Sequence, residues 1–352
     1  MTNVTFSETL PDFLPAPTLS LCLPTYKRAA LLGGALRAIL SQITPDMARA
    51  VEVLVLDNAS PDDTPAVVQK AQGDFPHVPI RYTRRPENIG PDANFTDALT
   101  RARGEFLFLL SDDDVLLPGA IARLLEMIAT HPGFDAFGLN TRPFTHSPDE
   151  DTAGIFRLDH DLVLMSCDDA LVFLNTHITF LSCIAFRRAN VLGKDYADKT
   201  GTILIQAFFF VDALAPGRGF YVTRQPFLAQ RADNNQGFDF FQVFVTNFDL
   251  VLRYALQNGY SFAAIRRVRA KVLRFVCYVI GVFKTKGALG TIRPDYRDGL
   301  ARLWRVYGPH PVLLLVIVPM VLTPRAVYAL LFERAYAALR RVRSRGAARR
   351  AP

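Results

Sequence analysis

The first 110 residues alternate short apolar runs with segments whose apolar residues recur at helical spacing. Four apolar runs are long enough for buried strands, namely residues 19–23, 51–56, 80–83 and 106–110. The helical segments between them are residues 31–41, 60–71 and 93–101. This β-α-β-α-β-α-β order predicts a doubly wound α/β domain, in which helices cover both faces of a mainly parallel sheet.

Polar side chains follow three of these runs, at the point where each run ends. They are Thr25, Tyr26 and Arg28 after the first run, Asp57 and Asn58 after the second, and Asp112, Asp113 and Asp114 after the fourth. Ligands of doubly wound sheets bind outside the carboxyl ends of the strands. We therefore expect these side chains to meet in one cleft.

The three consecutive aspartates Asp112, Asp113 and Asp114 are the most specific part of this pattern. Adjacent carboxylates repel one another unless a cation lies among them. Mg²⁺ and Mn²⁺ prefer oxygen ligands and are commonly shared with the phosphates of a substrate. The triplet therefore predicts a divalent cation and a phosphate-bearing ligand, and the alternative is a solvated turn or a helix cap.

Beyond residue 135 the pattern is less regular. We expect strands at 134–139, 179–186 and 220–223, helices at 167–174 and 203–214, and a loop at 141–160. Three longer helices are expected at 238–256, 263–283 and 296–307. The predicted organisation is an N-terminal extension (1–17), an α/β domain (18–235), a helical extension (236–310) and a tail (311–352).

The charge of the chain is uneven. Its 352 residues carry a formal net charge of +7, and residues 323–352 contain eight arginines against one glutamate. A basic end of this kind is typical of chains that contact an anionic partner, either a phospholipid surface or a nucleic acid. Hydrophobic residues make up 50% of the chain, which excludes global disorder.

The tail favours the phospholipid surface over the nucleic acid. Residues 311–322 are almost entirely apolar but too few to span a bilayer. Further apolar residues then recur at helical spacing, namely Tyr328, Leu331, Phe332, Ala335, Leu339 and Val342, with Arg334, Arg341 and Arg345 on another face. Such a helix suits the headgroup region of an anionic leaflet, and the alternative is a pair of core helices with a disordered basic end.

Cysteine usage and the N-terminus predict a cytoplasmic location. The four cysteines form no CxxC pair, which argues against a zinc site and against a disulfide framework. The N-terminus has no basic residue before an apolar core, so we expect no signal peptide. Peripheral attachment to the inner face of the cell membrane would accommodate both this location and the basic tail.

Four motifs occur in order along the α/β domain. They are Pro24-Thr25-Tyr26-Lys27-Arg28, Asp57-Asn58-Ala59-Ser60, Glu87-Asn88-Ile89-Gly90 with Asn94, and Ser111-Asp112-Asp113-Asp114. Together they closely resemble the family 2 glycosyltransferases of GT-A fold, and most of all the branch of O-antigen enzymes that includes abequosyltransferase-like proteins. The resemblance is specific over roughly 19–125 and weaker to about 235, which implies a nucleotide-sugar half (18–125) and an acceptor half (126–235).

The resemblance implies roles for the residues of these motifs. Asp57 would accept a hydrogen bond from the base, Pro24, Thr25 and Tyr26 would flank the base and ribose, and Arg28 would reach a phosphate. Asp113 would be the main metal ligand, Asp112 would contact the metal or the ribose, and Asp114 would face the donor sugar. Further contacts to the nucleotide sugar would come from Asn58, Asn88, Gly90, Asn94 and Arg231.

Some of these positions also have a structural interpretation. Gly90 suits a turn, Asn94 suits the start of a helix, and Asp57 suits the end of a strand. Arg84 and Arg85 lie near the predicted cleft, where a phosphate contact and a surface position are equally consistent with the sequence.

The base that would take a proton from the acceptor hydroxyl is the least certain residue. Relatives often supply a carboxylate at a position that corresponds here to Gln206, which cannot act as a base. The nearest carboxylates are Asp212, Asp198 and Asp195, and we place Asp212 first. The alternative for Asp212 is an acid at the end of a helix with no catalytic role.

The sequence thus predicts a metal-dependent, inverting glycosyltransferase with Mg²⁺ or Mn²⁺ as its cation. It would move a sugar from a nucleotide-sugar donor to a lipid-linked saccharide in cell-surface polysaccharide or O-antigen synthesis. The alternatives are a sugar-phosphate nucleotidyltransferase and a membrane-bound nucleotide-sugar-binding protein without catalysis. A dehydrogenase is disfavoured because no GxGxxG follows the first run, and we expect no nucleic-acid partner.

Overall fold

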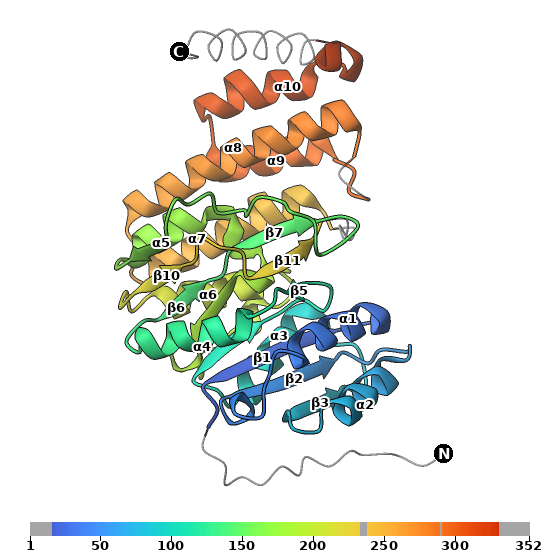
Figure 1. The fold of residues 1–352 in the computed structure, drawn as a ribbon. Helices are drawn as coiled ribbons and strands as arrows, with labels where there is room; N and C mark the ends of the chain where they lie inside the picture. Colours follow the sequence, from blue (N-terminus) through green and yellow to red (C-terminus); the bar gives the residue numbers. More distant parts are fainter. Residues whose placement is uncertain (1–15, 233–237, 289–290, 331–352) are drawn as a thin grey trace, which may run out of the picture. The chain divides into compact units, whose positions relative to one another are not determined.

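The computed structural model describes residues 16–232, 238–288 and 291–330 (Figure 1). The chain divides into two compact units. The first contains the described residues up to 232 together with 251–265, and the second contains the rest. The expected helical extension at 236–310 is therefore divided between the two units.

The first unit is built on a mixed sheet of eight strands in the order β3-β2-β1-β4-β9-β6-β10-β8 (Figure 1). Its strands are β1 (Leu19–Thr25), β2 (Val51–Asp57), β3 (Ile80–Arg84), β4 (Phe106–Leu109), β6 (Ala136–Gly138), β8 (Leu162–Leu164), β9 (Ile184–Arg187) and β10 (Phe220–Val222). Strands β1 to β4 are mutually parallel, whereas β9 runs antiparallel to both β4 and β6. This arrangement confirms the predicted doubly wound mixed sheet.

A second sheet of three strands has the order β5-β11-β7. Its strands are β5 (Val115–Leu116), β7 (Thr141–Phe144) and β11 (Leu228–Arg231). The expectation of a loop throughout 141–160 was therefore wrong at its start, where β7 pairs with β11. Likewise, the strand expected at 179–186 is present only as β9, because residues before Ile184 form short 3₁₀ turns.

Helices lie on both faces of the eight-stranded sheet (Figure 1). They are α1 (Ala29–Leu40), α2 (Thr64–Asp74), α3 (Pro91–Arg101), α4 (Ala120–Thr130), α5 (Cys167–Leu174) and α6 (Ile205–Leu214). The amphipathic helix α1 buries Leu32, Leu36 and Ile39 in the same apolar cluster as β1, β2 and β4. Every residue of α6 is buried, which fits its apolar sequence on all sides.

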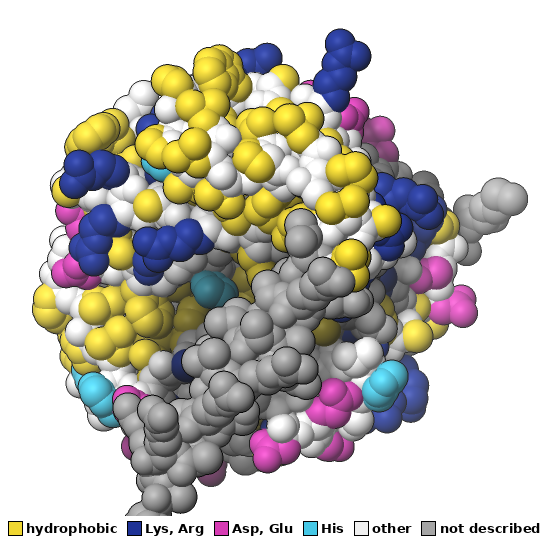
Figure 2. Space-filling model, turned by 90° about the horizontal axis from the view of Figure 1, so that it is seen from above, with side chains coloured by type: hydrophobic (Ala, Val, Ile, Leu, Met, Phe, Trp, Pro, Cys, Tyr) yellow, Lys and Arg dark blue, Asp and Glu magenta, His cyan; other side chains and the backbone are white. Residues whose placement is uncertain are grey.

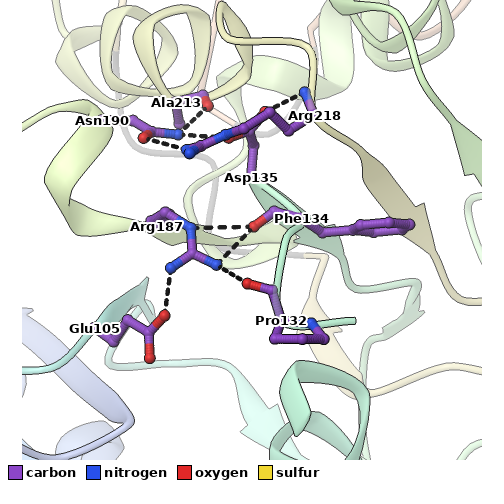
Figure 3. Close-up of polar contacts among 8 residues, drawn as sticks. All are labelled: Glu105, Pro132, Phe134, Asp135, Arg187, Asn190, Ala213 and Arg218. Carbon is purple, nitrogen blue, oxygen red and sulfur yellow. Dashed lines mark hydrogen bonds and ion pairs between the residues drawn. The ribbon is translucent and has the colours of Figure 1, made fainter. Parts of the chain in front are cut away.

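The amino edge of the sheet, opposite the carboxyl ends of β1 and β4, is held by a buried polar network (Figure 3). Asp135, just before β6, accepts hydrogen bonds from the backbone N–H and Nε of Arg218 at 2.7 and 2.8 Å and from Asn190 Nδ2 at 2.8 Å. Asn190 Nδ2 also donates to the carbonyl of Ala213 at 2.9 Å, near the C-terminus of α6. Nearby, Arg187 pairs with Glu105 and donates to two backbone carbonyls. These contacts fix the edge at which α6 ends.

The second unit consists of helices. They are the π-helix Gln242–Asn247, part of α7 (Phe248–Gln257), most of α8 (Phe262–Lys286), α9 (Tyr296–Tyr307), the π-helix Leu313–Ile317 and α10 (Val318–Leu322). The helices predicted at 263–283 and 296–307 are confirmed, whereas the one predicted at 238–256 begins as a π-helix. Lys284 Nζ donates to the carbonyls of Val321 and Thr323 at 2.6 and 2.8 Å, which caps the end of α10.

The described tail contains no helix that is both long enough and apolar enough to cross a bilayer. The helical pattern predicted from Leu331 onward lies outside the described residues.

Candidate active site

The carboxyl ends of β2, β1 and β4 are neighbours in the sheet, and their following loops are joined by hydrogen bonds. The backbone N–H of Asn58 donates to the carbonyl of Thr25 at 3.0 Å, and that of Lys27 donates to Ser60 Oγ at 3.0 Å. Thr25 Oγ1 in turn donates to Asp112 Oδ2 at 2.6 Å. The residues predicted to converge after three separate strands are therefore brought together.

Asp112 is held by cationic and hydroxyl partners. It accepts Thr25 Oγ1 at one oxygen and Arg28 Nη1 at the other, the latter at 2.9 Å. Burial raises the pKa of its carboxyl group, and the Arg28 charge opposes this effect. Both oxygens of Asp112 thus have partners within the protein, which does not favour the predicted direct contact between Asp112 and a metal.

Asp113 has different partners from Asp112. One oxygen accepts the Ser111 hydroxyl, and the other lies 3.7 Å from Arg28 Nη1, beyond hydrogen-bond distance. Its side chain is 5% exposed at the surface of the cluster. Of the three acids, Asp113 is the one that an added cation could reach with the least rearrangement.

Asp114 has an unsatisfied buried oxygen. Oδ1 accepts the backbone N–H of Arg231 at 3.2 Å, whereas Oδ2 is buried with no partner at good hydrogen-bond geometry in the described parts of the chain. Burial, together with the neighbouring charge of Asp113, raises the pKa of Asp114 to about 8, although the nearby Ser182 hydroxyl acts to lower it. A carboxylate in this environment is stabilised by any cation or hydrogen-bond donor that a ligand brings.

The acidic triplet could hold a hard divalent cation only if a ligand supplied further oxygen atoms. Among the described residues, no three His, Cys, Asp or Glu side chains are arranged to enclose a metal ion. Mg²⁺, however, is usually held by one or two carboxylates together with substrate phosphates rather than by an all-protein cage. Asp113, with the orphaned oxygen of Asp114 beside it, supplies a donor set of that kind.

Asp57, predicted to contact a base, is fully buried at the end of β2. Its Oδ1 accepts the backbone N–H of Ser60 at 2.8 Å, and its Oδ2 accepts the Tyr82 hydroxyl at 2.6 Å. Arg84 Nε lies 3.5 Å from the same oxygen, and the Arg84 side chain is 49% exposed. In the described conformation Asp57 therefore fixes the turn at 58–60 and the two β3 side chains above it.

Tyr82 is a residue that reasoning from the sequence missed. It is two residues before Arg84 on β3, which pairs in parallel with β2 so that Arg84 is opposite Asp57. Burial and the hydrogen bond to Asp57 both raise the pKa of Tyr82, so the hydroxyl stays a donor at neutral pH. The signal available in the sequence was the alternation on β3, which places Tyr82 and Arg84 on one face.

The amides of the third motif bind the protein's own loops. Asn58 Nδ2 donates to Asn88 Oδ1 at 2.9 Å and to the carbonyl of Gly90 at 3.1 Å, and Asn58 Oδ1 accepts the Ile89 N–H at 2.9 Å. Asn94 Nδ2 donates to the carbonyl of Leu56 at 3.1 Å. Gly90 has φ 81°, a left-handed conformation that a side chain rarely adopts. These contacts support the structural interpretation of Gly90 and Asn94.

Tyr26, Asn88 and Arg231 border the cleft from three directions. A hydrogen bond from Asn88 and the adjacent Lys27 lower the pKa of the exposed Tyr26 hydroxyl. The guanidinium of Arg231 lies 4.9 Å from the centre of the Phe144 ring, while its backbone N–H reaches Asp114. All three residues therefore lie near the acidic triplet or the loops bonded to it. Pro24, the remaining residue of the first motif, lies on β1 immediately before Thr25.

The structure does not favour Asp212 as a base. Its side chain is fully buried, and its oxygens accept Lys194 Nζ at 2.6 Å, the Tyr196 hydroxyl at 2.5 Å and the Tyr254 hydroxyl at 2.7 Å. Asp212 also precedes Ala213, whose carbonyl belongs to the network at the amino edge of the sheet. Asp212 is thus engaged by three donors and lies at the amino edge of the sheet, away from the acidic triplet. Both facts argue against Asp212 as the group that takes a proton from the acceptor.

The other predicted bases have local partners as well. Asp195 accepts the backbone N–H of Ala197 at 2.9 Å, and the exposed Asp198 pairs with Lys199. Gln206 lies at the opposite end of α6 from Asp212 and donates from Nε2 to the carbonyl of Thr179 at 2.7 Å. Thr179 is three residues before Ser182, whose hydroxyl accepts the backbone N–H of Ser111 at 2.9 Å. Gln206 is therefore on the cleft side of α6, where a carboxylate base would be needed.

Comparison with known proteins gives matches of two kinds. Residues 20–192 match the sequence family described as glycosyl transferase family 2. A GalNAc(5)-diNAcBac-PP-undecaprenol beta-1,3-glucosyltransferase of Campylobacter jejuni is 37% identical over 110 residues, which are 31% of this chain and 34% of that protein. Abequosyltransferase RfbV of Salmonella typhimurium is 24% identical over 231 residues, which are 62% of this chain and 67% of that protein. The chain thus matches only about a third of the length of the Campylobacter protein.

Solved structures of low sequence identity share the fold. Staphylococcus aureus TarS 1-349 in complex with UDP has a TM-score of 0.64 at 15% identity, over 90% of this chain and 92% of that one. The mannosyltransferase PcManGT of Pyrobaculum calidifontis, in complex with GDP-Man and Mn²⁺, has a TM-score of 0.53 at 17% identity, over 92% and 86% of the two chains. The eight-stranded mixed sheet with its flanking helices is the GT-A fold, and residues 20–192 of the chain match glycosyl transferase family 2.

Proposed function

We propose that this chain transfers a sugar from a nucleotide-sugar donor to a lipid-linked saccharide during the synthesis of a cell-surface polysaccharide. The observation that carries the proposal is the acidic cluster at the carboxyl end of β4, where three consecutive aspartates are buried beside one another and next to Thr25 and Arg28. Buried carboxylates beside one another are suited to a cation that arrives with the donor.

We propose that different residues of the site contact different parts of the donor. Tyr26 and Thr25 flank the nucleoside, and Asp57 meets the base after movement of the half-exposed Arg84 above it. Arg28, which is held at the acidic cluster by Asp112 at 2.9 Å, adds a positive charge where a phosphate oxygen of the donor would lie. Arg231 closes over the donor from the end of β11, and Asp114 faces the sugar.

Asp113 is the residue proposed to hold the divalent cation. When bound there, Mg²⁺ or Mn²⁺ would neutralise the negative charge that develops on the departing nucleoside diphosphate. Among the protein's own groups, Arg28 adds a second positive charge near the same phosphates, and Thr25 keeps Asp112 oriented so that Arg28 stays in place.

Transfer is proposed to invert the anomeric configuration, as a single displacement by an acceptor hydroxyl requires. Gln206 is the side chain on the cleft side of α6 and cannot take the proton of that hydroxyl. Burial and the neighbouring charge of Asp113 raise the pKa of Asp114 to about 8, so without a cation this carboxyl is largely protonated at neutral pH and is a poor proton acceptor. We therefore assign Asp114 to the donor side of the site and assign no residue of the described chain as the base.

The same observations leave one competing function. A nucleotide-sugar-binding protein without catalysis would also need Asp57 and Asp113, and the glutamine at position 206 is the specific feature that favours it. Release of nucleoside diphosphate from a nucleotide sugar distinguishes the two. The proposal expects release by the wild type with Mn²⁺, none with EDTA and none by Asp113→Ala, whereas binding without turnover of any donor would support the alternative.

Peripheral attachment to an anionic membrane is proposed from the second unit. On α8, Arg267, Lys271 and Arg274 follow one another at helical spacing, and Tyr278, one turn further, is 70% exposed. Burial and the two neighbouring arginines lower the pKa of Lys271, so the three cations crowd one face of the helix. A basic stripe that ends in an exposed aromatic side chain suits the headgroup region of the cytoplasmic leaflet.

Exposed apolar side chains around α10 support this attachment. Leu315 and Leu322 are 76% and 72% exposed, and Figure 2 shows hydrophobic side chains gathered on the face that carries α10, with Lys and Arg beside them. Leu315→Ser/Leu322→Ser is expected to reduce sedimentation with anionic phospholipid vesicles. Leu192→Ser, which removes an exposed leucine from the first unit, is the matched control and should sediment like the wild type. Equal sedimentation of all three proteins would contradict the attachment.

The base of the donor can be identified before any acceptor is known. A thermal-shift screen of nucleoside diphosphates with Mn²⁺ or Mg²⁺ should give the largest rise in Tm for the base that the Tyr26 and Asp57 region accepts.

A further inference from the structure

A cavity of about 400 Å³ lies in the acceptor half of the first unit, beside the three-stranded sheet. Three arginines from separate segments line it, together with one aspartate and uncharged polar groups. The polar and charged lining residues are Arg142, Arg157, Arg224, Asp151, Thr152 and Gln225. Neither the four motifs nor the proposed donor site uses any of them.

The wall that carries Arg157 and Arg224 is fixed by a buried asparagine. Asn140 Nδ2 donates to the carbonyl of Phe156 at 2.9 Å and to that of Arg224 at 2.5 Å, while its Oδ1 accepts the Phe156 N–H at 2.9 Å. A side chain at Gly154 would come within 2.6 Å of Asn140. The backbone on both sides of the cavity is therefore held in one arrangement before any ligand binds.

The remaining walls are fixed in the same way. Glu150 accepts the backbone N–H groups of His146 and Ser147 at 2.6 and 2.8 Å, and Thr152 Oγ1 donates to the carbonyl of Pro143 at 2.5 Å. On the other side, Arg123 stacks on Phe227 and donates to the carbonyl of Gln225 at 3.3 Å. The cavity is a preformed site rather than a gap between loose loops.

The charges of the lining favour an anion. Arg142 Nη2 donates to the carbonyl of Pro148 at 3.0 Å, but its Nε is buried without a partner in the described chain. Arg157 and Arg224 are exposed, and Asp151 supplies the only carboxylate among the lining residues. Three guanidinium groups around a preformed hollow are suited to the oxygens of a phosphate or diphosphate, which they can contact in pairs.

The cavity is separate from the proposed donor site. Arg231 contacts Asp114 at the end of β11, whereas Pro226 lines the cavity before β11 begins. No residue of the four motifs lines the cavity, and the lining residue nearest to the acidic triplet in the sequence is Leu117, three residues after Asp114. The cavity therefore has a lining of its own beside the acidic triplet, and a titration without a divalent cation distinguishes the two sites.

We propose that this cavity is a second anion site and that it binds the diphosphate group of the lipid-linked acceptor. The three arginines of the lining support the anion site whatever the reaction is. The assignment of that anion to the acceptor rests on the function proposed above. Holding the diphosphate there would orient an acceptor whose reacting hydroxyl reaches the donor sugar at the far end of β11.

The test is isothermal titration of the full chain with inorganic diphosphate in EDTA, so that no cation supports the donor site. The wild type is expected to bind, and Arg157→Gln/Arg224→Gln is expected to bind about tenfold or more weakly, because each variant residue loses charge-assisted hydrogen bonds. Arg49→Gln removes an exposed arginine elsewhere in the first unit and is expected to match the wild type, as is Asp113→Asn. Unchanged binding by the double variant, or equal weakening by Arg49→Gln, would overturn the anion site.

Two further measurements separate the possible failures. Geranyl diphosphate should bind with the same dependence on Arg157 and Arg224, and its exclusion while inorganic phosphate binds would overturn the assignment to a lipid-linked acceptor. Metal-dependent donor hydrolysis by Arg157→Gln/Arg224→Gln should equal that of the wild type. If neither the wild type nor the variant hydrolyses any donor, the proposed transferase function is wrong. The titration in EDTA would still decide whether the cavity binds an anion.

Discussion

The two edges of the main sheet hold buried carboxylates in opposite ways. At the carboxyl edge, Asp114 is 2% exposed and has an oxygen without a partner in the described chain. At the amino edge, Asp135 is 0% exposed and Asp212 is 1% exposed, yet both accept hydrogen bonds from three donor groups. The buried acids at the two edges therefore differ in their hydrogen-bond partners and not in their burial. We propose that the less fully bonded Asp114 and its neighbour Asp113 belong to the donor site at the carboxyl edge.

The largest expected effect follows from removing the charge of Asp113. Asp113→Asn should slow the metal-dependent release of nucleoside diphosphate by about 10²- to 10³-fold, since the charge of the leaving group would no longer be neutralised. Steady-state kinetics with Mn²⁺ measures this loss. The free energy of unfolding without metal should change little, because asparagine keeps an oxygen that can accept the Ser111 hydroxyl.

Asp46→Asn is the matched control, because Asp46 is an exposed aspartate in the same unit. A similar loss of rate in Asp46→Asn would show that the effect is not specific to the acidic triplet.

At the amino edge the expected effect is on stability. Asp212→Asn should lower the free energy of unfolding by about 3 kcal/mol, because Lys194 and two tyrosine hydroxyls lose a shared buried carboxylate. Urea denaturation measures the change, and the rate of donor hydrolysis per folded molecule should stay near that of the wild type. Loss of that rate with unchanged stability would restore Asp212 as a catalytic residue.

Asp92 combines features of Asp113 and Asp212. It is buried at the carboxyl edge, like Asp113, but its carboxylate accepts several hydrogen bonds, like that of Asp212. It accepts the backbone N–H groups of Gly201 and Ile203 at 2.8 Å each and that of Ile205 at 3.4 Å. Asp92→Ala should lower the free energy of unfolding by about 2 kcal/mol, because these donors are left without a partner. Denaturation with urea checks this value, and no change in stability would show that water replaces the carboxylate at little cost.

The smallest effect is expected at Tyr82. Tyr82→Phe removes one hydrogen bond to Asp57 and should weaken the binding of the preferred nucleoside diphosphate by a few-fold, about 1 kcal/mol. Titration calorimetry measures it. Tighter binding by Tyr82→Phe would mean that Tyr82 competes with the nucleotide for Asp57 instead of orienting it.

The fold and the convergence of the motif residues at one edge of the sheet were largely predictable, because each strand and the polar residues after it are encoded in one short segment. Asp57 and Asp112–Asp114 each follow an apolar run directly, and parallel strands bring their carboxyl ends to one edge. Tyr82 was missed because its role depends on the register between β2 and β3, which no single segment encodes.

The acceptor half was harder to predict because its contacts join distant segments. Asn140 binds the carbonyl of Arg224, 84 residues away, and this bond turns the expected loop at 141–160 into one wall of a cavity. Asp212 looked available in the sequence since its partners Lys194 and Tyr254 lie 18 and 42 residues away. Long-range partners decide these cases, and composition and spacing do not reveal them.

A crystal structure of the full chain with Mn²⁺ and its preferred nucleoside diphosphate would show directly whether the acidic triplet binds the cation and the nucleotide. We expect an anomalous manganese peak in contact with the Asp113 carboxylate, the base against Tyr26, and Arg28 close to the phosphates. Manganese away from the acidic triplet, or a nucleotide whose diphosphate occupies the arginine-lined cavity instead, would contradict this expectation.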